Sequence, residues 1–338
     1  MYIPSIKNIF KWISLICLLE AIYYYPTPAQ PNTPPKTINP TWAEDDEVPE
    51  IAISLDDAPM PGTVLFSGMD KTKAIIQKLQ AVNSPAVGIF ALGIHTQGAQ
   101  NMERLRMYGE AGHILANHSY SHYRLKDVTA QVFIKDIQKA HECLSSLPNF
   151  FPLFRFPYLC KGKDAQQRQE VMQALKGMGY QEGYVTVSNH DYYINKLVLQ
   201  AAKAGKQIDY EKLKKVYISI LWDCIETYER LARKVLKRKV KHVLLLHEND
   251  LAALFIGDLI EHIRNQGWKV IAIEGAYKDP MADIALMTNY GDIGRIAAIG
   301  VEKGMGKGLV GFPPTTQLKY IAEALKQEKA FVDPKPVP

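Results

Sequence analysis

The sequence predicts an α/β fold, and more narrowly a distorted (β/α) barrel of the TIM type with seven parallel strands. Short apolar runs alternate with stretches of helical periodicity from residue 50 to residue 278. One run, Val243–Leu246, is continuously apolar, as expected of a strand buried on both faces. A stretch of about 230 residues suits a barrel, and an open doubly wound sheet is the alternative.

The pattern assigns strands and helices in chain order. The apolar runs cover residues 51–55, 86–92, 113–116, 153–156, 184–187, 242–246 and 269–273. Helical periodicity covers residues 70–82, 98–110, 127–147, 164–178, 209–238 and 251–266. The stretch 191–241 is too long for a simple connection. We therefore expect a helical insertion there, before the last histidine motif, with Tyr210–Lys239 as its main helix.

Composition excludes several classes of protein. The 338 residues are 47% hydrophobic and 22% charged, which excludes a disordered chain, a coiled coil and a disulfide scaffold. No apolar stretch reaches about 18 residues, so a polytopic membrane protein is excluded. The four cysteines form no C-x-x-C pair, which argues against a cysteine zinc site. The formal charge is +5, and the basic residues in 233–241 are interpreted as a helix end, with no nucleic-acid partner.

The two ends of the chain have their own signals. Lys7 and Lys11 precede a short apolar segment, so residues 1–29 are predicted to be a signal peptide or an N-terminal membrane anchor. Export to the periplasm, the cell envelope or the medium follows from this expectation. Residues 30–49 are rich in proline and indicate an extended linker. Residues 279–338 form a C-terminal extension to which the sequence assigns no role.

Polar residues follow the predicted strands, at the edge where parallel sheets place their sites. Asp56 and Asp57 end the first strand, and adjacent carboxylates repel each other unless a cation lies beside them. Such a pair is also common in turns. His118 and His122 follow the third strand at i, i+4 spacing, which would place both on one helix face, able to bind one metal ion. Alternatively, they are surface residues at the start of a helix.

Three later strands also end in polar residues. Arg155 and Tyr158 follow strand four, Asp191 and Tyr192 follow strand five, and His247 follows strand six. An arginine is always charged and pairs with carboxylates. A histidine directly after a buried strand needs a polar partner. Each of these residues could be structural when it is considered alone.

Taken together and in this order, the motifs resemble those of the polysaccharide deacetylase family, carbohydrate esterase family 4, over residues 50–278. The motifs are Asp-Asp, His-x-x-x-His, Arg-x-Pro-Tyr, an Asp-aromatic pair and Leu-x-x-His. The resemblance implies that Asp57, His118 and His122 bind a divalent metal. Zinc is the expected ion, and cobalt or nickel would suit the same donors.

The resemblance also implies roles for the other residues. Asp56 would be the general base, held by Arg155, and His247 would be the general acid, oriented by Asp191. The backbone N–H of Tyr158 would stabilise the oxyanion. Tyr192 would contact the substrate, at a position where the family commonly has tryptophan.

The implied activity is removal of N-acetyl groups from an N-acetylglucosamine polysaccharide, with release of acetate. Peptidoglycan or a chitin-like polymer would be the substrate and partner. An O-acetyl esterase acting on xylan-like glycans and a non-catalytic glycan-binding relative are the alternatives. A binding module needs neither Asp56 nor His247, and the chain has both.

Overall fold

The computed structural model describes residues 47–288, 290 and 293–333. The expectations for residues 1–29, and for most of the proline-rich segment 30–49, lie outside the described residues. Within the described part, no helix is both long and apolar enough to cross a membrane.

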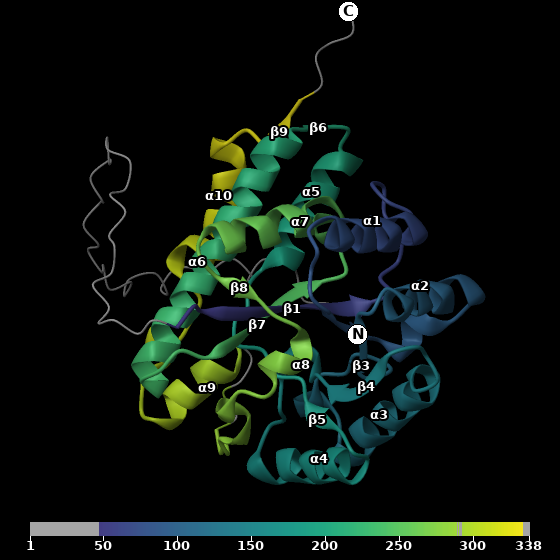
Figure 1. The fold of residues 1–338 in the computed structure, drawn as a ribbon, viewed down its shortest axis with the longest axis vertical. Helices are drawn as coiled ribbons and strands as arrows, with labels where there is room; N and C mark the ends of the chain where they lie inside the picture. Colours follow the sequence, from purple (N-terminus) through teal and green to yellow (C-terminus); the bar gives the residue numbers. More distant parts are fainter. Residues whose placement is uncertain (1–46, 289, 291–292, 334–338) are drawn as a thin grey trace, which may run out of the picture. The chain divides into compact units, whose positions relative to one another are not determined.

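A parallel sheet of seven strands forms the centre of the fold (Figure 1). The strands are β1 (Glu50–Ala58), β2 (Gly88–Ala91), β3 (Ile114–Asn117), β4 (Phe150–Phe154), β5 (Gln181–Glu182), β7 (Lys241–His247) and β8 (Lys269–Val270). Their order is β5-β4-β3-β2-β1-β7, and β8 pairs with the start of β1. The predicted α/β class, the parallel pairing and the number of strands in the sheet are confirmed.

The sheet curves back on itself through the residues that follow β5. Val187 bridges Leu244 of β7 in parallel, and the Leu245 N–H donates to the Val187 carbonyl at 3.1 Å. The predicted strand 184–187 is therefore only a bridge, because regular pairing with β4 occurs earlier, at β5. Gly183 lies between the two pairings, and a Cβ there would meet the Phe90 ring at 2.5 Å. This closing contact distinguishes the barrel from an open sheet.

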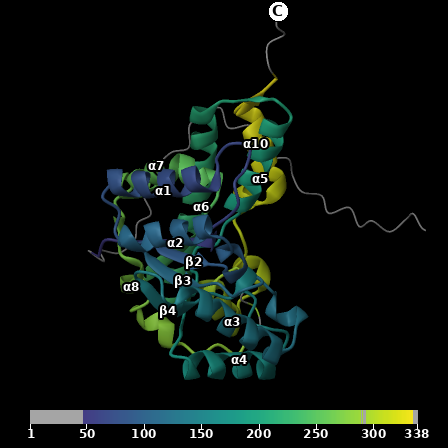
Figure 2. The same cartoon turned by 90° about the vertical axis from the view of Figure 1, so that its right-hand side faces the viewer.

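Helices surround the sheet (Figures 1 and 2). They are α1 (Gly68–Ala81), α2 (Ala99–Glu110), α3 (Ala130–Leu144), α4 (Ala165–Gly177), α5 (Asp191–Lys203), α6 (Tyr210–Leu236), α7 (Asp250–Asn265), α8 (Ile273–Ala276), α9 (Arg295–Glu302) and α10 (Leu318–Gln327). The six predicted helices are confirmed close to their expected bounds. Side chains that cap helix N-termini fix five of these starts: Ser67, Thr129, Asp164, Asp209 and Asn249.

The predicted insertion consists of α5, a short strand β6 (Gln207–Ile208) and the long helix α6. The C-terminal residues pack against it: β9 (Phe331–Val332) pairs antiparallel with β6, and α10 lies beside α5 and α6 (Figure 2). This part of the C-terminal extension, α10 and β9, is thus joined to the insertion.

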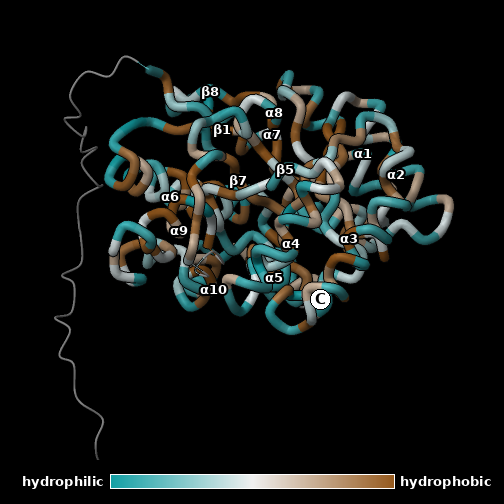
Figure 3. The backbone as a smooth tube through the Cα atoms, turned by 90° about the horizontal axis from the view of Figure 1, so that it is seen from below, coloured by the Kyte–Doolittle hydropathy of each residue, from teal (hydrophilic) through white to brown (hydrophobic). Residues whose placement is uncertain are grey.

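Apolar residues concentrate along the strands and the inner helix faces, and hydrophilic residues follow the outer loops (Figure 3). Ile51, Ile53 and Leu55 of β1 are completely buried. Buried apolar surface stabilises the fold by roughly 25 cal/mol per Å². The core thereby makes β1 and β7 a rigid base for the polar residues at their carboxyl ends.

Candidate active site and metal centre

The carboxyl ends of the strands surround a cavity of about 640 Å³. Its volume is within the range of roughly 300–1,000 Å³ that is typical of small-molecule sites. Most of the residues singled out from the sequence line it: Asp56, Asp57, His118, His122, Tyr158, Tyr192 and His247. The other two, Arg155 and Asp191, are buried behind the wall, where they contact Asp56 and His247.

Both carboxylates of the Asp-Asp pair reach this cavity because β1 is irregular at its end. Neighbouring side chains of a regular strand face opposite sides of the sheet. The pairing of β1 with β2 shifts register between Asp56 and Ala58, and Asp57 has a φ of 66°. This bulge turns the Asp57 side chain to the side that Asp56 already faces.

Asp57, His118 and His122 form a group that can hold a metal ion. Their ligand atoms lie within 4.8 Å of one another. The Nε2 atoms of His118 and His122 are 3.5 and 3.4 Å from Asp57 Oδ1. Asp57 Oδ1 is buried and has no hydrogen-bond partner in the described part of the chain. An unpaired buried carboxylate oxygen is costly, so one carboxylate and two imidazoles here fit a divalent cation.

The two histidines do not lie on a helix, so that expectation is wrong. Residues 118–122 form a loop after β3, in which Ser119 and His122 have φ values of 73° and 58°. The Ser119 N–H donates to Asn117 Oδ1, the His122 N–H donates to Ser119 Oγ, and Asp136 accepts two further backbone N–H groups. These side-chain bonds replace the backbone bonds that a helix would need.

The loop leaves Nε2 of both imidazoles free to bind a metal. His118 Nδ1 lies 2.9 Å from the Arg155 carbonyl, which can only accept, so Nδ1 carries the proton and Nε2 keeps its lone pair. Burial lowers the pKa of His122 to about 4, so its ring is neutral at pH 7. Metal ligation requires neutral imidazoles.

Asp56 lies beside this group and is held by Arg155. Asp56 Oδ2 is 3.7 Å from His118 Nε2, and Oδ1 accepts a hydrogen bond from the guanidinium. The guanidinium also donates to Ser54 Oγ at 2.8 Å and to Tyr277 Oη at 3.0 Å. These bonds fix the Asp56 carboxylate at the cavity wall and place a positive charge behind it.

His247 lies next to Asp56 on the neighbouring strand, because the two residues pair in register between β1 and β7. His247 Nδ1 is 2.7 Å from Asp191 Oδ1. Asp191 Oδ2 accepts from the His247 N–H and from Asn249 Nδ2, both at 2.9 Å. Burial alone would lower the pKa of His247, but Asp191 outweighs it and raises the pKa to about 10. The imidazole is therefore protonated at neutral pH and can act as an acid.

Tyr158 and Tyr192 form exposed aromatic walls, each 49% exposed. The Tyr158 ring centroid lies 4.5 Å from that of His122, and the Arg124 guanidinium lies 4.4 Å from the Tyr158 ring. The Tyr192 ring lies edge-on to His247 at 5.9 Å. The mouth of the cavity is thus suited to a ring-shaped ligand with apolar faces.

Sequence reasoning missed several residues of the cavity wall: Met60, Arg124, His190, Asn195, Asn249 and Phe312. Arg124 and Asn249 each come two residues after a motif histidine, so closeness to a motif could have identified them. Phe312 lies in the C-terminal extension, where no sequence pattern indicated a role.

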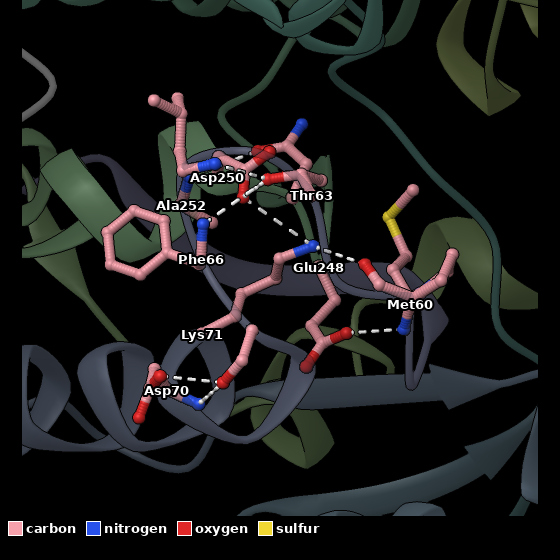
Figure 4. Close-up of polar contacts among 12 residues, drawn as sticks. Met60, Thr63, Phe66, Asp70, Lys71, Glu248, Asp250 and Ala252 are labelled. Carbon is pink, nitrogen blue, oxygen red and sulfur yellow. Dashed lines mark hydrogen bonds and ion pairs between the residues drawn. The ribbon is translucent and has the colours of Figure 1, made fainter.

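A buried polar cluster lies behind the wall and connects the loop after β1 with the loop after β7. Glu248 accepts from the Met60 N–H, and Lys71 donates to the Pro61 carbonyl at 2.9 Å (Figure 4). Lys71 also lies 3.6 Å from Asp250 Oδ1. The cluster therefore fixes the segment that leads from Asp57 to α1, including Met60 at the cavity wall.

Comparison with known proteins agrees with the motifs. Residues 43–197 match the family model described as polysaccharide deacetylase, a match that ends before His247. The chain is 31% identical over 110 residues to a peptidoglycan-N-acetylglucosamine deacetylase of Bacillus cereus. The match covers 32% of this chain and 36% of that protein, so it spans about a third of each.

Solved structures with a similar fold include a chitin deacetylase from the fungal pathogen Colletotrichum lindemuthianum. It is 18% identical with a TM-score of 0.47, over 69% of this chain and 89% of that one. A pseudoenzyme of carbohydrate esterase family 4 from Bacillus anthracis is 17% identical with a TM-score of 0.45, over 68% and 65% of the two chains. The family match covers residues 43–197, less than half of the chain, and over these residues the chain is similar to the polysaccharide deacetylase family.

Proposed function

We propose that this chain is a metal-dependent hydrolase that removes N-acetyl groups from an N-acetylglucosamine polysaccharide, with release of acetate. The supporting observation is the Asp57, His118 and His122 group beside Asp56 and His247 in one cavity. The family match supports the reaction class, and the named Bacillus cereus relative supports peptidoglycan as the glycan.

A divalent ion held by Asp57, His118 and His122 would supply a Lewis acid for the amide carbonyl and would make a water more acidic. Zinc is the default for this donor set, and cobalt or nickel also suit it. Asp56 lies where it can take a proton from the attacking water. Arg155 keeps the carboxylate at that position.

The remaining steps use His247, Asp191 and Tyr158. Water oxygen forms a bond to the acetyl carbon, the carbon–nitrogen bond breaks, and His247 gives its proton to the departing amine. Asp191 keeps His247 protonated and oriented for this transfer. The backbone N–H of Tyr158 would donate to the oxyanion. The products are acetate and a free amine on the sugar.

The test is acetate release from N-acetylglucosamine oligomers, peptidoglycan and acetylated xylan by zinc-loaded protein. We expect release from the first two, complete loss with a chelator, and loss of most turnover in Asp56→Asn with zinc content retained. Asp127→Asn is the matched control, because Asp127 is exposed and outside the cavity.

Three results would contradict the proposal. Full activity of Asp56→Asn would remove the assigned base. Acetate release from xylan alone would make the protein an O-acetyl esterase, and binding of glycans without any acetate release would make it a non-catalytic relative.

We also propose that the protein acts outside the cytoplasm, on the basis of the signal-like features of residues 1–29. N-terminal sequencing of protein recovered from cell fractions tests this location. Processed protein in the envelope or medium is expected, and intact residues 1–29 on cytosolic protein would contradict it.

A further inference from the structure

The cavity extends beyond the metal group, along α5 and the C-terminal extension. Asn195 of α5 and Phe312 line it together with the candidate catalytic residues. A row of rings leads there: Tyr192 lies 5.9 Å from His247, His190 lies 5.8 Å from Tyr192, and Phe312 lies 4.2 Å from His190, measured between ring centroids. This row is a continuous aromatic wall that begins at the proton donor.

Phe312 is held in a fixed position. His190, against which Phe312 packs, has its Nδ1 atom 2.9 Å from the Thr316 carbonyl. Thr316 is completely buried, and its hydroxyl donates to the Pro313 carbonyl at 2.9 Å. Residues 312–316 therefore form an anchored turn on the cavity wall, built by contacts between the insertion and the C-terminal extension.

Asn195 supplies a polar group whose hydrogen bonding is incomplete. It lies one helical turn after Asp191 on α5 and is 7% exposed. Its Oδ1 is buried and has no hydrogen-bond partner among the residues that the structure describes. An unsatisfied amide at a cavity wall is costly unless a ligand completes it. The side-chain amide offers both donors and an acceptor, which match a hydroxyl group.

An aromatic face next to an amide is the chemistry that recognises a sugar ring. A pyranose presents an apolar C–H face that packs on an aromatic ring, and its hydroxyls both donate and accept hydrogen bonds. We propose that Phe312 and Asn195 form a second sugar subsite, which binds the unit next to the N-acetylated sugar in the same glycan chain. This inference rests on the proposed function and requires an oligomer or polymer as substrate.

The subsite is for a neighbouring unit because the reacting acetamide has its own place. That group must lie between the Asp57 group and His247. Phe312 is separated from His247 by the rings of Tyr192 and His190. A ring stacked on Phe312 is therefore a different sugar from the one that loses its acetyl group.

The experiment measures binding of N-acetylglucosamine monomer, dimer and tetramer by titration calorimetry. Chelator-treated protein is used, so hydrolysis does not change the ligands. In the wild type, affinity should rise from monomer to tetramer. In Phe312→Ala and in Asn195→Ala, the ratio of tetramer affinity to monomer affinity should be about tenfold smaller, which corresponds to about 1.4 kcal/mol. Phe312→Leu keeps the apolar volume without the flat ring and should also lose most of the gain.

Matched controls come from the same elements. Tyr320 is an exposed aromatic residue of α10 in the C-terminal extension, and Gln200 is an exposed polar residue of α5. Neither lines this cavity. Tyr320→Ala and Gln200→Ala should keep the wild-type dependence on chain length. With zinc-loaded protein, Phe312→Ala should raise KM for the tetramer and leave kcat nearly unchanged.

The outcomes separate this inference from the proposed function. Tetramer affinity that depends on Phe312 and Asn195, without acetate release from any glycan, would support the subsite and overturn the hydrolase. Acetate release with wild-type chain-length dependence in all three variants would overturn the subsite alone. A wild-type protein that binds monomer and tetramer equally well also overturns the subsite.

Discussion

Arg104 donates to both carboxylate oxygens of Glu248, each at 3.0 Å, and both side chains are buried. The same arginine nitrogen donates to the Met60 carbonyl at 2.8 Å, while Glu248 accepts from the Met60 N–H. Met60 lines the cavity, and Glu248 directly follows His247. One ion pair therefore holds two loops that carry the candidate active site.

Removal of Glu248 should destabilise the fold strongly. Glu248→Ala leaves Arg104 charged and buried without its partner, which typically costs about 3–5 kcal/mol. Urea denaturation measures the loss. Glu103→Ala, which breaks an exposed pair with Arg106, is the matched control and should cost less than about 1 kcal/mol. Similar small losses in both variants would show that the buried pair has no special role.

Asp191→Asn should change how His247 titrates. Burial lowers the pKa of His247 and the Asp191 charge raises it, with a net value of about 10. Without that charge, only the Asp57 and Asp56 carboxylates still oppose burial, so the pKa should fall from about 10 toward its ordinary value of about 6.5. NMR titration of the imidazole in chelator-treated protein measures this directly. In active protein the alkaline limb of the pH–rate profile should move to lower pH.

The ion pair of His247 and Asp191 also predicts how the free energy of unfolding depends on pH. Because the folded-state pKa of His247 is raised, the ion pair stabilises fully below the unfolded value of about 6.5. This contribution is lost as pH rises toward about 10. The difference in unfolding free energy between wild type and Asp191→Asn should therefore be larger at acidic than at alkaline pH. A difference that grows with pH would contradict the assigned pair.

The sequence predicted the sheet and the main helices because both depend on local periodicity. Val243–Leu246 is apolar because both faces of β7 are covered. The site was predictable in part, because motifs that end parallel strands converge at one edge of the sheet. Asp56 and His247 meet there by register alone.

The rest depends on features that no periodicity encodes. The bulge at Asp57 and the loop that carries His118 and His122 are set by single side-chain bonds, such as that from the His122 N–H to Ser119 Oγ. Phe312 reaches the cavity through contacts between segments more than a hundred residues apart in sequence, such as His190 and Thr316. Such long-range contacts are decided by tertiary packing.

Metal binding should stabilise the protein through His122. A ligand bound only by the folded state adds about 2.7 kcal/mol when its concentration is a hundred times Kd. Zinc should therefore raise the unfolding free energy of the wild type, and His122→Ala should lose most of this increase. His262→Ala is the control, since His262 lies on α7 outside the metal group. Equal zinc stabilisation in His122→Ala and wild type would exclude His122 as a ligand.

Because of Asp279, the free energy of unfolding should depend on pH in the acidic range. Burial would raise its pKa, but hydrogen bonds from Arg238 and from the N–H groups of Lys241 and Met281 outweigh burial and lower it. A depressed folded-state pKa gives stability that is present above the unfolded value of about 3.9 and is lost as pH falls through the folded value. Asp279→Asn should therefore cost about 1.5–3 kcal/mol at pH 7.

The difference between Asp279→Asn and wild type should shrink steadily below about pH 4, where the wild-type carboxyl also becomes neutral. Urea denaturation at pH 7 and at pH 3 measures it. Asp283→Asn is the matched control, because Asp283 is a nearby acidic residue that makes no ion pair within the described ranges. If Asp279→Asn lowered the free energy of unfolding equally at both pH values, the charge of Asp279 would not be what stabilises the contact between the end of α6 and the C-terminal extension.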